Sequence, residues 1–229
     1  MEIMSILELE WTNLVETDAT LRLQLALEGA FYLIAYCAGL RGEEVPLTDI
    51  HGIRSTFEAS GNHSRPHVVV ALIGRFKSEL GLNSHLMALV SVTKSGLEPR
   101  KWIGRVIAEY DRIGVTHGPM FRNAFGQRIK ASAMEGKFFG RLAEVQQSKP
   151  HLMPGIEDVE EEYGVYRSFR RGVTSRAMDL GLPTDVVEAN NRWRRFNKAG
   201  ASRPSLSMRE HYTDVTLTLN HRLRFSENL

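Results

Sequence analysis

The sequence of 229 residues has few of the features that mark exported or membrane-spanning proteins. It contains one cysteine, Cys37, so an intrachain disulfide and a four-cysteine metal site are both excluded. Its most apolar stretch, Leu25 to Leu40, is interrupted by Glu28 and Gly29 and is too short to cross a bilayer. The chain begins Met-Glu-Ile-Met-Ser, with an acid where a secretory signal carries basic residues. These absences predict an intracellular protein in a reducing compartment, with no membrane partner.

Internal repeats, low-complexity segments and a Pro/Gly/Ser-rich linker are also missing, which predicts one domain over residues 1–229. A hydrophobic content of 42% and a charged content of 24% are typical of a globular protein and exclude a disordered chain. The net charge is +2, yet Tyr163 to Leu229 carries twelve Lys/Arg against six Asp/Glu. A surface that faces a polyanion and a merely solvated helical face both explain this excess.

The hydrophobic periodicity predicts a mainly helical α+β fold with one small antiparallel sheet. Asp18 is a candidate N-cap, and helices are expected almost throughout from about Ala131 onward. A turn at Lys77 to Ser84 should join two strands into a hairpin. The other predicted elements are helices at Trp11–Leu40, Pro99–Ile113 and Ser205–Arg224, an extended stretch at Val45–Ile53, and strands at His67–Phe76 and His85–Val92.

Four short polar features stand out, and they lie far apart in the sequence. The stretch Gly-Leu-Arg-Gly-Glu-Glu-Val places Arg41 just after a buried helix, and Lys77 lies in the turn of the predicted hairpin. Helical spacing puts Arg167 and Arg170 on one face, and Tyr212 lies in the last predicted helix. Each alone has an ordinary explanation: a cation at a helix end, a solvated lysine, surface arginines and a half-buried tyrosine.

In this order, the features resemble the catalytic domain of the tyrosine recombinase/integrase family, including its eukaryotic mobile-element members. The family's first box, Gly-Leu-Arg-x-x-Glu followed by a hydrophobic residue, matches Gly39–Val45. Its second box, His-x-Leu-Arg-Arg, aligns with Arg167–Arg171, with arginine in the histidine place. Trp193 follows Arg170 at the family's distance for a His or Trp, and the context of Tyr212 matches the nucleophile box.

The resemblance covers most of the chain and implies DNA strand cleavage and rejoining through a 3′-phosphotyrosyl intermediate, with no metal and no other cofactor. A phenol oxygen that attacks phosphorus preserves the energy of the broken bond, and Tyr212 would be this nucleophile. Arg41 and Arg170 would hold the non-bridging oxygens, because a guanidinium is always charged and binds phosphate through two N–H groups. Lys77 would protonate the leaving 5′ oxygen, with Lys94 as the competing candidate.

Other polar residues take supporting roles in the resemblance. Arg167 and Trp193 would line the phosphate, and Glu44 would orient Arg41 or a neighbouring helix rather than transfer protons. Double-stranded DNA is the expected partner, bound by a homo-oligomer of two to four copies. The expected DNA contacts are Arg171, Arg192, Arg194, Arg195, Lys198 and Arg203.

Three departures from the family pattern qualify the expectation. Arg167 supplies no neutral proton acceptor, although it can still donate to a phosphate oxygen. The interval from Trp193 to Tyr212 is longer than is common, and Lys198 to Pro204 resembles an insertion. The DNA-clamping domain that usually precedes the catalytic one is not part of this sequence, so the chain is either an excised domain or one that encloses DNA with partners.

Some alternatives stay open at the level of sequence. A type IB-like topoisomerase and an inactive DNA-binding module that keeps the fold are the competing functions. The tail residues Leu217, Leu219 and Leu223 are typical of an amphipathic helix, which could dock on a neighbouring copy or on its own core. The compartment would be the nucleus for a eukaryotic element and the cytoplasm for a prokaryotic or phage protein.

Overall fold

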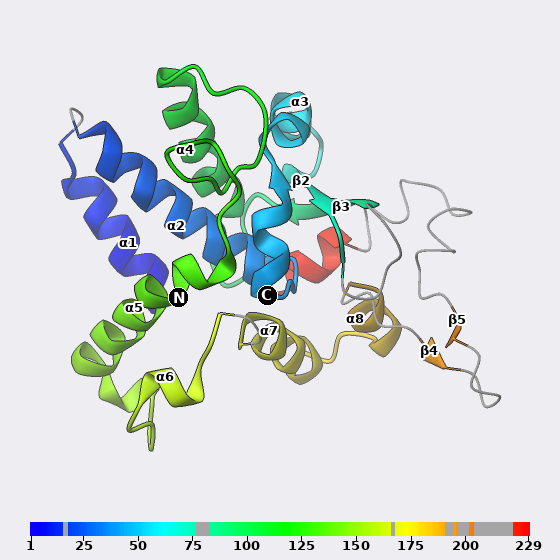
Figure 1. Ribbon diagram of the computed structural model, residues 1–229. Helices are drawn as coiled ribbons and strands as arrows, with labels where there is room; N and C mark the ends of the chain where they lie inside the picture. Colours follow the sequence, from blue (N-terminus) through cyan, green and yellow to red (C-terminus); the bar gives the residue numbers. More distant parts are fainter. Residues whose placement is uncertain (16–17, 77–82, 166–167, 191–194, 197–201, 204–221) are drawn as a thin grey trace.

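The computed structural model confirms a mainly helical α+β chain with a small antiparallel sheet (Figure 1). It describes residues 1–15, 18–76, 83–165, 168–190, 195–196, 202–203 and 222–229. The helices are α1 (Glu2–Asn13), α2 (Ala19–Cys37), α3 (Ile50–Gly61), α4 (Pro99–Arg112), α5 (Glu135–Ser148), α6 (Val159–Glu162), α7 (Ser168–Asp179) and α8 (Thr184–Asn190). Short 3₁₀ helices are η1 (Gly42–Leu47), η2 (Ala131–Met134) and η3 (Pro150–Leu152).

The larger sheet has three antiparallel strands in the order β1 (Thr48–Asp49), β2 (His67–Gly74) and β3 (Asn83–Val90). Thr48 is paired with Leu72, and His67 is paired with Val90 at the far end of the β2–β3 ladder. Three alternate residues of β2 are fully buried, whereas Ile73 is 43% exposed. The sheet therefore presents one apolar face to the core, as the valine-rich stretch of β2 predicts.

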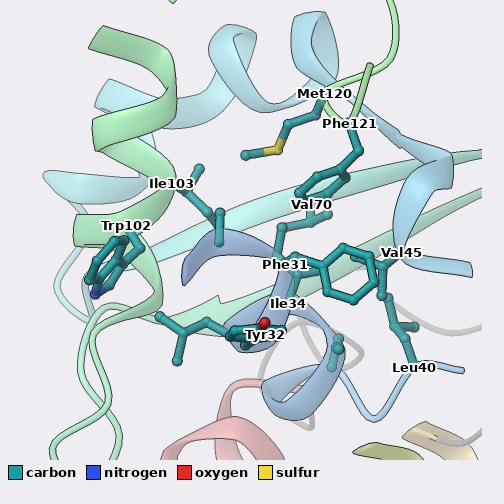
Figure 2. Packing of buried hydrophobic residues seen from close by; sticks show 14 of the residues in the cluster. Phe31, Tyr32, Ile34, Leu40, Val45, Val70, Trp102, Ile103, Met120 and Phe121 are labelled. Carbon is teal, nitrogen blue, oxygen red and sulfur yellow. The ribbon is translucent and has the colours of Figure 1, made fainter. Parts of the chain in front are cut away.

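Helix α2 forms the centre of the main hydrophobic core (Figure 2). Phe31 packs edge-to-face on Phe121, with 5.4 Å between the ring centroids. Gly29 allows the indole of Trp102 on α4 to lie against α2, because a Cβ at this position would come within 2.2 Å of the ring. This close approach joins α2 and α4 into the framework that carries the chain segment after α2.

Several local predictions are confirmed by the structure. Asp18 caps α2, and its Oδ1 accepts a hydrogen bond from the backbone N–H of Leu21 at 3.0 Å. The paired strands lie within two residues of their predicted bounds, and Pro99 opens α4 as expected. The predicted joining turn overlaps residues 77–82, which lie outside the described part of the chain.

Two predictions of local structure are wrong. The stretch Val45–Ile53 is not an extended segment, since it contains the end of η1, the two residues of β1 and the start of α3. Asp49 explains the change, because its side chain accepts from the backbone N–H of Gly52 and caps α3. The region after Ala131 is also not helical throughout. It contains a two-stranded ladder of β4 (Arg195–Phe196) and β5 (Ser202–Arg203).

The described end of the chain, residues 222–229, packs on its own core rather than standing apart (Figure 1). Phe225 joins a cluster with Val173 of α7, and Leu223 packs on Val90 of β3. The hydroxyl of Ser226 accepts from the backbone N–H of Val90 at 2.9 Å. Of the two docking alternatives for the tail, the structure shows packing on the same chain for this part; Leu217 and Leu219 lie outside the described residues.

Within the described ranges, no helix combines the length and the apolar character that crossing a bilayer requires.

Candidate functional site

The first polar feature begins at a helix end that the residue types themselves specify. Gly39 adopts a φ of +61°, a conformation that favours glycine, and it ends α2. The backbone N–H of Leu40 donates to the carbonyl of Ala35 at 2.9 Å, and that of Gly39 donates to Tyr36 at 3.0 Å. This is a Schellman motif, with Leu40 fully buried beneath it. The chain therefore turns sharply after α2 and places Arg41 at the N-cap of η1.

Glu44 lies between the turn and the arginine that follows it. Its Oε2 accepts from the backbone N–H of Arg41 at 3.0 Å, as in a capping box at the start of η1. Its Oε1 lies 3.6 Å from Nη1 of the Arg41 side chain. Glu44 is 4% exposed, so its charge is held inside the protein. Glu44 therefore contacts both the backbone and the side chain of Arg41.

The second polar feature meets the first through Arg170 of α7. Its Nη2 donates to Oε2 of Glu44 at 2.6 Å, and its Nε donates to the carbonyl oxygen of Gly39 at 2.8 Å. Asn190 at the end of α8 donates to the neighbouring carbonyl of Ala38 at 3.1 Å. The carbonyls that α2 leaves unpaired at its C-terminus are thus satisfied by side chains from two later helices.

Gly42 allows these elements to meet. A Cβ at Gly42 would lie 2.3 Å from the backbone oxygen of Val165, which is too close for any larger residue. Val165 is fully buried and stands shortly before the start of α7. The close approach of backbone to backbone fixes the distance between η1 and the entry to α7, and so fixes where Arg170 points.

Arg41, Glu44 and Arg170, which we name the arginine cluster, place two cations around one carboxylate. Arg170 has 8% of its side chain exposed, whereas Arg41 has 33%. Buried charges are stable only when they are paired and hydrogen-bonded, and the shared carboxylate meets that need for Arg170. The surplus positive charge is carried by the more exposed Arg41, which suits the binding of an anion from solvent.

Two groups near the end of α2 are poor candidates for a nucleophile. Burial raises the pKa of the Cys37 thiol to about 12, so the thiol is protonated at neutral pH. Burial also raises the pKa of the Tyr36 phenol above its usual value.

The cavity described beside α2 does not include the arginine cluster. This cavity of about 450 Å³ lies between α1, α2 and α5, and its lining includes Tyr36, Phe169 and Arg176 but no member of the cluster.

The structure describes the surroundings of only some of the other predicted site residues. Arg171 is exposed on α7, next to the buried Arg170. Arg195 and Arg203 are backbone partners in the β4–β5 ladder. Lys94 contacts the C-terminal segment, because its Nζ donates to Asn228. The predicted residues that lie outside the described part of the chain are Lys77, Arg167, Arg192, Trp193, Arg194, Lys198 and Tyr212.

Sequence reasoning missed one member of the site's surroundings, Asn190. It is 6% exposed, and its amide caps a carbonyl more than 150 positions earlier in the chain. An asparagine near the end of a predicted helix carries no signal for such a distant partner. In the ranges that the structure covers, no three His, Cys, Asp or Glu side chains gather in a way that could hold a metal ion.

Comparison with models of known protein families and with curated proteins finds no match to this chain.

Proposed function

We propose that the protein cleaves and rejoins DNA as a tyrosine recombinase, through a 3′-phosphotyrosyl intermediate formed by Tyr212. The observation that carries the proposal is the meeting of Arg41 and Arg170 on the carboxylate of Glu44. The two arginines are 129 positions apart, and the resemblance assigns both to the same phosphate. Their convergence on one carboxylate supports that assignment, because it brings two permanently charged guanidiniums, which can bind phosphate oxygens, to one place in the fold.

In this mechanism the members of the arginine cluster have two different roles, one in positioning Arg170 and one in binding the DNA phosphate. Glu44 and Gly39 hold the Arg170 guanidinium in one orientation, and Arg41 presents the more accessible fork to a non-bridging oxygen. The phenol of Tyr212 loses its proton to water and attacks phosphorus, the bond to the 5′ oxygen breaks, and Lys77 gives that oxygen a proton. The reverse sequence of steps rejoins the strand, so no external energy source is needed.

A nicked suicide duplex tests the proposal, because loss of the short leaving strand traps the covalent intermediate. The wild-type protein should form an SDS-resistant adduct with DNA, and Tyr212→Phe should form none. Tyr36→Phe is the matched control, since it removes a hydroxyl near the end of α2 and should leave the adduct intact. Absence of an adduct with the wild-type protein, on duplexes that it binds tightly, contradicts the proposal.

The neighbouring arginines of α7 give a second control. Arg170→Lys should lower the rate of adduct formation about 100-fold, because lysine cannot donate to Gly39 and Glu44 as a planar fork. Arg171→Lys keeps an exposed positive charge and should change the rate by less than about three-fold. Equal effects of the two substitutions would argue against a specific role for the arginine cluster.

A second candidate is an inactive DNA-binding module that keeps the fold. It is favoured by the burial of Arg170 and its bonds to Gly39 and Glu44, which could serve stability alone. The same adduct assay separates the two candidates. A plasmid relaxation assay then separates a recombinase from a type IB-like topoisomerase, which would relax supercoils as a monomer without paired sites.

A further inference from the structure

A hairpin at residues 121–129, between α4 and η2, presents an aromatic ring to solvent. Phe125 at its tip is 87% exposed, more than any other large hydrophobic residue that the structure describes. A single exposed apolar side chain is ordinary in itself. Phe125 differs because hydrogen bonds hold the backbone on either side of it, and because the charged residues that flank it in the sequence are all positive.

Hydrogen bonds fix the tip of the 121–129 hairpin. The side-chain Oδ1 of Asn123 accepts from the backbone N–H groups of Phe125 and Gln127, both at 3.0 Å. The carbonyl of Asn123 accepts from the N–H of Gly126, which has a φ of +76°. Asn123 and Gln127 are also joined through their backbones at 2.9 Å. A ring presented on such a turn loses little conformational freedom when it binds.

The stem of the hairpin is anchored to the hydrophobic core and to the sheet. Met120 and Phe121 are buried in the main core (Figure 2). The backbone N–H of Met120 donates to the carbonyl of Thr48, which directly follows η1. Arg128 donates to the carbonyl of Ile73 near the end of β2. The hairpin is therefore tied to the segment that begins at Arg41.

The charge around the ring is entirely positive along the chain. Residues 113–134 contain Arg122, Arg128 and Lys130 and no Asp or Glu. Arg128 and Lys130 are exposed. Asp49 forms a backbone bridge with Pro119 of this stretch, and its carboxylate is engaged in capping α3. An exposed aromatic ring on a segment whose only Lys/Arg/Asp/Glu side chains are cations is complementary to nucleic acid, which offers base faces beside phosphates.

We propose that the 121–129 hairpin is a DNA contact in which Phe125 stacks on a base that has left the helical stack, while Arg128 and Lys130 approach the adjoining phosphates. The choice of DNA as the polyanion rests on the proposed function. The stacking step itself requires no covalent chemistry. The anchor at Thr48 links this contact through the backbone to the strand that follows η1.

Fluorescence anisotropy with two probes tests the contact: a short fluorescein-labelled duplex, and the same duplex with a central two-nucleotide bulge. Phe125→Ala should weaken binding of the bulged duplex about ten-fold, as expected for loss of one stacked aromatic, and that of the perfect duplex by much less. Phe125→Trp should restore tight binding, because indole also stacks. Lys130→Gln should instead weaken both probes alike and lower the salt slope by about one.

Leu9→Ala is the matched control, since Leu9 is an exposed apolar residue of α1 that lies in another part of the chain. It should leave both affinities unchanged. If Phe125→Ala binds the bulged duplex as tightly as the wild-type protein does, the stacking inference is wrong while the proposed function stands. If the wild-type protein is then found to form a dimer that this variant does not form, Phe125 is a contact between copies of the chain. A wild-type protein that binds neither probe overturns the inference together with the proposed function.

Discussion

Two ion clusters, each built around a buried carboxylate, join distant segments of this protein, and they differ in the balance of the charges that the structure describes. In the arginine cluster one carboxylate, that of Glu44, faces two guanidiniums. In the second, between α1, α2 and α5, one guanidinium, that of Arg141, faces the carboxylates of Glu10, Glu28 and Glu144. We name this second set the Arg141 cluster. Both sets bring together charges that the sequence holds far apart.

The balance of charge indicates that the Arg141 cluster is structural, whereas the arginine cluster is suited to binding an anion. The Arg141 guanidinium donates to both oxygens of Glu10, and these hydrogen bonds raise its pKa further. Glu28 also accepts from the phenol of Tyr32 at 3.1 Å. All of this set's donors are committed to carboxylates, and its surplus charge is negative. The arginine cluster has a positive surplus and a partly exposed member, Arg41.

Removal of Arg141 should have the largest effect on stability. Arg141→Met leaves Glu28, which is 3% exposed, without its closest cation. We expect the free energy of unfolding in urea to fall by about 3–5 kcal/mol. The double variant Glu28→Gln with Arg141→Met should recover a large part of the loss, because no buried charge then remains unpaired. A change below about 1 kcal/mol in Arg141→Met would show that the Arg141 cluster contributes little.

The close approach at Gly42 should have the next largest effect, and it should act on the arginine cluster. Gly42→Ala forces η1 away from Val165, which should cost about 1–3 kcal/mol of stability. DNA adduct formation should fall further than the lost stability explains, because Arg170 moves away from Glu44. Gly136→Ala in α5 is the control, since no atom lies near its new methyl group, and it should be neutral or stabilising by about 1 kcal/mol. Equal results for both glycines would contradict this explanation.

Local signals in the sequence predict much of the framework. Gly39 and Leu40 specify a helix end, Asp18 specifies a helix start, and Pro99 opens α4, because each acts through hydrogen bonds within a few residues. The alternating apolar pattern predicts β2 and β3, because this pattern too can be recognised from neighbouring residues alone. The candidate site is predicted only as a set of separate motifs, and the resemblance alone relates Arg41 to Arg170.

Contacts between distant segments could not be predicted. Nothing local marks Arg141 as the partner of Glu28, or Val165 as the backbone that approaches Gly42. The extended prediction at Val45–Ile53 fails because an apolar stretch this short fits a strand and a buried turn equally well. The capping contact of Asp49 decides between them, and it becomes visible only when the geometry is known.

The cap that α8 supplies should have a smaller effect than either cluster. Asn190→Ala removes the donor to the carbonyl of Ala38 and leaves that acceptor buried, so we expect a loss of about 1 kcal/mol in urea unfolding. Asn13→Ala, at the exposed end of α1, is the control and should change stability by less than about 0.5 kcal/mol. A loss above about 3 kcal/mol for Asn190→Ala would mean that this amide also supports the arginine cluster directly.

A half-exposed ion pair outside both clusters should have the smallest effect, and it adds a pH dependence. Arg105 donates to both oxygens of Glu8 at 2.7 and 2.8 Å, and these bonds lower the pKa of Glu8 below its ordinary value of 4.5. A lowered pKa stabilises the folded state above the ordinary value, and this stabilisation is lost as the pH falls through the folded-state value. Glu8→Gln should therefore cost about 0.2–1 kcal/mol at pH 7 and almost nothing in strong acid. Urea unfolding at several pH values measures this difference, and a cost that stays constant with pH would contradict an ionic contribution.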